Sequence, residues 1–97
     1  MINYMNMERE EVYMKVREMT INELGLEDVA IDEKTNLARD FGIDSLDIID
    51  LLIRIDMEFG INTGDNPKDI EMMCGGTISD IVNVVERLLK EKKLNNV

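Results

Sequence analysis

One serine stands where its hydroxyl could be covalently modified. Ser45 directly follows Asp44, comes shortly after the turn residue Gly42, and opens a run of apolar residues at helical spacing. The first turn of a helix presents unpaired backbone N–H groups and a partial positive charge, which favour a phosphate ester at that position. The alternative is an ordinary N-cap, the commoner role of such a serine, and replacement by Ala would then cost about 1 kcal/mol.

The residue types that the chain lacks exclude several kinds of catalytic and metal site. The chain contains no histidine, which removes Ser-His-Asp and Cys-His catalysis and most zinc sites. The single Cys74 has no partner for an internal disulfide, and no neighbouring cation marks it as a reactive thiolate. We therefore expect no catalytic residues and no metal site, in a protein that is not an enzyme.

The elements that must position Ser45 are helices. Apolar residues recur at i, i+3, i+4 and i+7 over about 8–24, 45–59 and 77–93, and a shorter helix is expected over about 67–75. No segment alternates apolar and polar residues as a strand does. The sequence predicts an all-α fold, a small four-helix bundle with three longer helices and one short one. It forms a single domain over 1–97, with a core over about 8–92 and frayed ends.

A long loop is expected between the first and second helices, over residues 26–44. It still carries regularly placed apolar residues: Val29, Ile31, Leu37 and Phe41. A loop of this length with such residues is more readily explained if it is pinned to the core.

The helix after Ser45 has three kinds of face at about 100° per residue. One is a core face of Ile48, Leu51, Leu52, Ile55 and Phe59. The opposite side carries the charged residues Asp47, Asp50, Arg54 and Glu58. A further apolar stripe lies away from the core centre and consists of Leu46, Ile53 and Met57. Apolar residues bordered by acids indicate a docking strip, and the alternative is a wider buried arc.

The net charge restricts the partners. Asp and Glu number 21 against 11 Lys and Arg, a formal charge of -10. Such a chain repels nucleic acid and anionic lipid headgroups and favours a partner with a basic surface. No stretch approaches the roughly 20 apolar residues of a membrane span, so membrane insertion is not expected. The free cysteine and the lack of a signal-like start predict a cytoplasmic location.

The residues around Ser45 also carry a family resemblance. The run from Phe41 to Asp47, FGIDSLD, continuing to EFGI at residues 58–61, resembles the signature of acyl carrier proteins. In that family an Asp-Ser-Leu triplet begins the second helix, and its serine receives 4′-phosphopantetheine from coenzyme A. Asp44, Ser45 and Leu46 match the triplet, and the resemblance extends over about residues 8–92.

The resemblance implies both a cofactor and partners. The cofactor is a covalent 4′-phosphopantetheine on Ser45, beside Asp44 and Leu46, and the partners are a phosphopantetheinyl transferase and acyl-processing enzymes. Partner recognition is implied for the second helix, at positions occupied here by Leu46, Asp47, Asp50, Ile53, Asp56 and Met57. Arg54 adds a cation to a face that is usually acidic or neutral in the family, so we count it as a further partner-binding residue, one that changes which enzymes dock. A monomer is expected.

Three functional hypotheses remain at this level. The first is an acyl carrier, in fatty acid synthesis or in a specialised lipid or polyketide-type pathway. The second is an acidic helical adaptor with no prosthetic group, in which Ser45 only caps a helix. The third is an aminoacyl, peptidyl or D-alanyl carrier that uses the same arm for other cargo.

Overall fold

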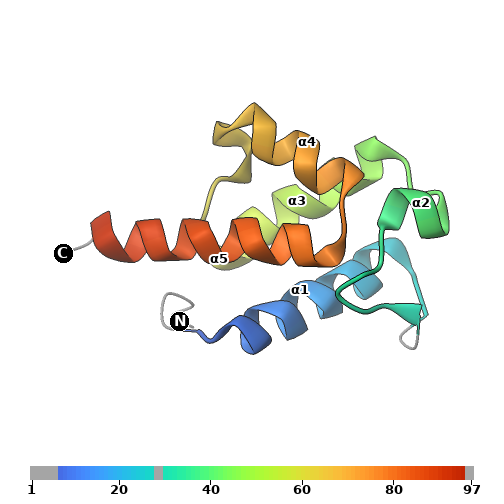
Figure 1. Ribbon diagram of the computed structural model, residues 1–97, viewed down its shortest axis with the longest axis horizontal. Coiled ribbons are helices and arrows are strands. Elements are labelled where there is room, and N and C mark those ends of the chain that lie inside the picture. Colours follow the sequence, from blue (N-terminus) through green and yellow to red (C-terminus); the bar gives the residue numbers. More distant parts are fainter. Residues whose placement is uncertain (1–6, 28–29, 96–97) are drawn as a thin grey trace.

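The computed structural model describes residues 7–27 and 30–95 of the 97-residue chain. Within this part lie four longer helices: α1 (Arg9–Leu24), α3 (Ser45–Phe59), α4 (Pro67–Gly75) and α5 (Ile78–Asn95). A five-residue helix, α2 (Leu37–Phe41), precedes α3, and a 3₁₀ turn, η3 (Thr63–Asp65), precedes α4. Figure 1 shows α1 and α5 running along the length of the molecule, with α4 on the other side of α5 from α1. The predicted all-α four-helix fold is confirmed.

Local sequence explains where α3 begins and ends. Asp44 is extended, with φ −68° and ψ 146°, and its side chain caps the first turn. Gly42, just before it, and Gly60, just after the helix, have φ of 65° and 67°. This left-handed conformation is readily adopted only by glycine, so Gly42 ends the preceding helix and Gly60 ends α3.

The core is built almost entirely from aliphatic side chains. Helix α3 contributes its predicted stripe, with Ile55 completely buried. Helix α5 contributes six buried residues: Ile78, Ile81, Val82, Val84, Val85 and Leu89. Val12 and Val16 of α1 and Met73 of α4 complete the contact between the helices.

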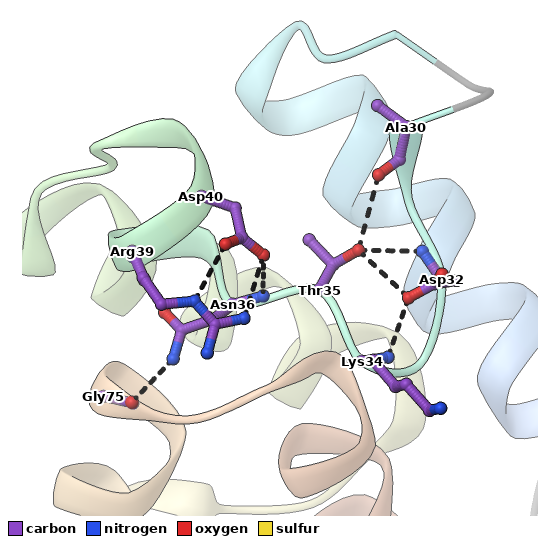
Figure 2. Close-up of polar contacts among 8 residues, drawn as sticks. All are labelled: Ala30, Asp32, Lys34, Thr35, Asn36, Arg39, Asp40 and Gly75. Atoms are coloured by element: carbon purple, nitrogen blue, oxygen red, sulfur yellow. Dashed lines mark hydrogen bonds and ion pairs between the residues drawn. The ribbon is translucent and has the colours of Figure 1, made fainter.

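The loop between α1 and α3 is held in place by polar contacts and by two buried side chains. Ile31 and Leu37 are buried, as predicted, whereas Phe41 is 37% exposed and Val29 lies outside the described residues. Figure 2 shows Thr35 joined to Asp32 and Ala30, and the Asn36 side chain donating to the carbonyl of Gly75 over 3.0 Å. Ile78 N–H also donates to the Thr35 carbonyl over 2.9 Å. The loop is thereby fixed to the junction of α4 and α5.

Two features of the backbone differ from the sequence-based prediction. Helix α2 lies inside the segment predicted as loop, capped by Asn36, whose side chain accepts from the N–H of Arg39 over 2.9 Å. Helix α5 continues to Asn95, past the predicted fraying point, while residues 1–6 and 96–97 lie outside the described part.

In the described residues, no helix is long and apolar enough to cross a membrane.

Candidate attachment site and docking face

Ser45 is the first residue of α3, and Asp44 is its cap. The Asp44 carboxylate accepts a hydrogen bond from the N–H of Leu46 over 2.8 Å. The Ser45 side chain is exposed, and its hydroxyl has no hydrogen-bond partner among the described residues. The alternative in which Ser45 itself caps the helix is wrong, because Asp44 occupies that position. The hydroxyl is therefore free of a structural role in the cap.

The backbone around Ser45 suits an anionic group. Leu46 N–H is taken by the Asp44 side chain, and Ile48 N–H donates to the Asp44 carbonyl over 3.1 Å. The N–H groups of Ser45 and Asp47 have no acceptor within the described residues. Two unpaired donors at the positive end of a 15-residue helix favour a phosphate bound to the serine oxygen. The residues present thus fit a phosphodiester-linked arm.

The apolar stripe of α3 is open to solvent. Leu46 is 70% exposed, Ile53 52% and Met57 80%, so the wider buried arc considered as an alternative is wrong. Ile49, which the sequence analysis did not assign to this surface, is 36% exposed beside them. Its position could have been read from the 100° spacing, which places it between Ser45 and Ile53 around the helix.

The charged side of α3 faces a surface groove of about 620 Å³ beside the end of α1. Asp47 and Asp50 line it, are exposed, and have no ion-pair or hydrogen-bond partner in the described chain. Arg54 also lines it, with its Nε 2.7 Å from Glu23 Oε2 of α1. Glu58 lies further along, 3.6 Å from Lys15 Nζ. Exposed pairs of this kind stabilise a fold by only about 0–1 kcal/mol.

Asp56 is separated from the other predicted docking residues. Its carboxylate accepts hydrogen bonds from the N–H and the hydroxyl of Thr63, over 3.0 and 3.1 Å. Burial raises the pKa of Asp56 above its ordinary value, and the two bonds from Thr63 only partly offset this effect. Asp56 thus anchors η3 to α3 at the edge of the exposed apolar stripe. The sequence gives no sign of this contact, which depends on how the chain returns after Gly60.

The described residues hold no cluster of three or more His, Cys, Asp or Glu side chains suited to a metal ion. Cys74 is partly buried on α4, and burial raises the pKa of its thiol. A raised pKa lowers the thiolate fraction, so nothing here makes Cys74 a nucleophile. The chemistry of the site therefore rests on Ser45 and its surroundings.

Comparisons with known proteins agree with this geometry. A protein family model described as "Phosphopantetheine attachment site" matches residues 15–85. An acyl carrier protein of Thermotoga maritima is 36% identical over 81 residues, covering 84% of this chain and 95% of the relative. Acyl carrier proteins of Campylobacter hominis and Coprothermobacter proteolyticus are 30% and 27% identical, over 84% and 89% of this chain and 99% and 100% of theirs. The chain therefore belongs to the acyl carrier protein family, whose members carry a covalently attached 4′-phosphopantetheine and act as carriers served by a phosphopantetheinyl transferase and acyl-processing enzymes.

Proposed function

We propose that the chain carries acyl groups as thioesters on a 4′-phosphopantetheine arm attached to the Oγ of Ser45. The observation that carries this proposal is the free, exposed hydroxyl of Ser45 at the start of α3, beside two unpaired backbone donors. The arm supplies the thiol that holds the cargo. The chain supplies the attachment point and the recognition surface, and catalyses no reaction itself.

The side chains around Ser45 have distinct roles in this proposal. Asp44 fixes the first turn, so that the serine is presented in one orientation. The exposed stripe is buried when a partner docks, and the acids beside it attract the partner's basic surface. The partner-binding residues are Leu46, Asp47, Asp50, Ile53, Arg54 and Met57, with Asp56 supporting the edge of the face.

The partners we propose are a phosphopantetheinyl transferase and acyl-processing enzymes whose docking surfaces are basic. The formal charge of -10 supports this choice and disfavours nucleic acid. We place the protein in the cytoplasm as a monomer, in fatty acid synthesis or a specialised lipid or polyketide-type pathway.

Intact-mass spectrometry tests the attachment residue. The purified protein is incubated with coenzyme A and a broad-specificity phosphopantetheinyl transferase, and we expect one added phosphopantetheine. Ser45→Ala abolishes the addition. The matched control is Ser79→Ala at the only other serine, whose hydroxyl accepts a hydrogen bond from Arg9 over 3.0 Å; this variant is loaded normally.

Other outcomes separate the rival functions. A wild-type chain that gains no mass is the result expected of an acidic adaptor, and it contradicts the proposal. If the chain isolated from its own cells carries an aminoacyl or peptidyl group on the arm at Ser45, it is an aminoacyl or peptidyl carrier rather than an acyl carrier.

We further propose that an apolar cargo is sheltered between α3 and α4. A recess of about 100 Å³ lies there, lined by Ile49, Leu52, Ile53, Asp56, Thr63, Gly64 and Ile70. It has the volume of only about three water molecules, so a long chain requires the core to part. Methyl NMR shifts of Leu52 and Ile70 that stay unchanged on loading with a long acyl chain would contradict this.

A further inference from the structure

Three charged side chains form an ordered row along α3. Asp47, Asp50 and Arg54 are separated by three and four residues, so they lie on one side of the helix, about 4.5 and 6 Å apart along its axis. All three line the same groove. The row therefore reads negative, negative, positive from the attachment end of the helix.

Arg54 is held in place from one side. Its closest contact is the 2.7 Å approach of Nε to Glu23 Oε2, and the described residues give it no partner other than Glu23. The side chain is nevertheless 61% exposed. A guanidinium has five N–H donors in a planar fork, so a single carboxylate leaves donors available to a second one. Glu23 thus orients the Arg54 guanidinium and leaves several of its N–H donors without an acceptor in the described residues.

The fold does not require this arrangement. The helices α1 and α3 already pack through buried aliphatic side chains, and an exposed ion pair adds little to stability. A uniformly basic partner would meet Arg54 with a like charge, which opposes docking. A partner with a carboxylate opposite Arg54 gains a bidentate contact.

We infer that Arg54 determines partner specificity: it selects partner proteins that place a carboxylate next to the two cations facing Asp47 and Asp50. Charge complementarity identifies this occupant, since the row offers two free carboxylates and one incompletely paired guanidinium. The inference rests on the proposed function, because docking here precedes any reaction at Ser45.

The test measures loading of Ser45 by the phosphopantetheinyl transferase of the same organism, with coenzyme A at low salt. Arg54→Glu should raise KM for the carrier about tenfold and leave kcat unchanged, since docking is weakened and the chemistry is not. Arg54→Lys should give an intermediate KM, because it keeps the charge and loses the fork. Lys90→Glu, on exposed α5 surface, changes the net charge equally and should leave KM unaltered.

A compensating change in the transferase completes the test. Replacing the carboxylate that contacts Arg54 by Lys should restore docking of Arg54→Glu and weaken docking of the wild type. Unchanged or faster loading of Arg54→Glu overturns the inference and favours a uniformly basic partner, while normal loading of the wild type preserves the proposed function. A wild-type chain that accepts no arm overturns both.

Discussion

Helices α3 and α5 are both amphipathic, and they use their outer surfaces differently. Each buries an aliphatic stripe in the common core. On the outer side of α5, three charged residues have partners within the chain: Arg87 binds Asp69, Glu86 lies 3.5 Å from Arg9, and Lys92 donates to the carbonyl of Gly60 over 3.0 Å. On α3, Arg54 and Glu58 are paired with α1, whereas Asp47 and Asp50 have no partner within the described residues.

The apolar residues show the same contrast. Apart from Leu94 near its end, α5 exposes no large apolar side chain in its described length, whereas α3 exposes Leu46, Ile53 and Met57. Helix α5 shows that a helix of this fold can be stable with a buried aliphatic stripe and almost no large apolar side chain exposed. The exposed apolar and acidic residues that α3 carries in addition support the proposal that a partner docks on this helix.

The largest difference in stability is expected between substitutions at two isoleucines of α3. Ile55 is 0% exposed and Ile53 is 52% exposed, two positions apart on one helix. Ile55→Ala should lower the free energy of unfolding by about 2–5 kcal/mol, because it leaves a cavity. Ile53→Ala should stay within about 0.5 kcal/mol. Urea denaturation measures both; a comparable loss at Ile53 would mean that the stripe belongs to the fold.

The outer charges of the two helices give the next contrast. The Asp69 side chain is only 7% exposed and is paired with Arg87, so Arg87→Ala leaves a carboxylate buried and unpaired. We expect a loss of about 2 kcal/mol in the free energy of unfolding. Asp50→Ala, the matched change on α3, should stay within about 0.5 kcal/mol. Equal losses would remove the distinction between the two surfaces.

Substitutions at the two neighbouring residues Asp44 and Ser45 distinguish helix capping from attachment of the arm. Asp44→Ala should cost about 1 kcal/mol of unfolding free energy, because the bond to Leu46 is lost. Ser45→Ala should change stability by less than about 0.5 kcal/mol, since its hydroxyl has no bond in the described structure. Thermal unfolding of both variants is the measurement. A larger loss at Ser45 than at Asp44 would restore the serine as a structural residue.

The smallest effect concerns Asp56 and depends on pH. Burial is the main reason why its pKa is raised in the folded protein. Protonated Asp56 therefore contributes stability that is present below the ordinary value of about 3.9 and is lost as pH rises through the raised pKa. Asn stays neutral and can keep both contacts with Thr63. Wild type should thus lose stability relative to Asp56→Asn between pH 4 and 7; a relative gain would contradict this.

Much of the fold could be predicted from the sequence because it depends on local signals. The repeat of apolar residues and the glycine after it define α3, and the observed Ser45–Phe59 matches the prediction. Helix α2 was not predicted because its five residues are too few to show a helical period of apolar residues. Asn36 as cap and Gly42 as stop are its only local signs.

The candidate site was predictable in position and less so in its contacts. Exposure of Leu46, Ile53 and Met57 follows from their angle around the helix. The Glu23–Arg54 pair and the Asp56–Thr63 bonds join segments whose approach is set by packing of whole helices. Periodicity within one helix carries no information on such contacts, so Asp56 was grouped with residues from which the structure separates it.

The central claim is that Ser45 carries the prosthetic group, and the most direct measurement is fragmentation mass spectrometry of the protein isolated from its own cells. We predict one 4′-phosphopantetheine, located on the peptide that contains Ser45. A chain that is unmodified in those cells, or that carries the group on any other residue, would contradict this account.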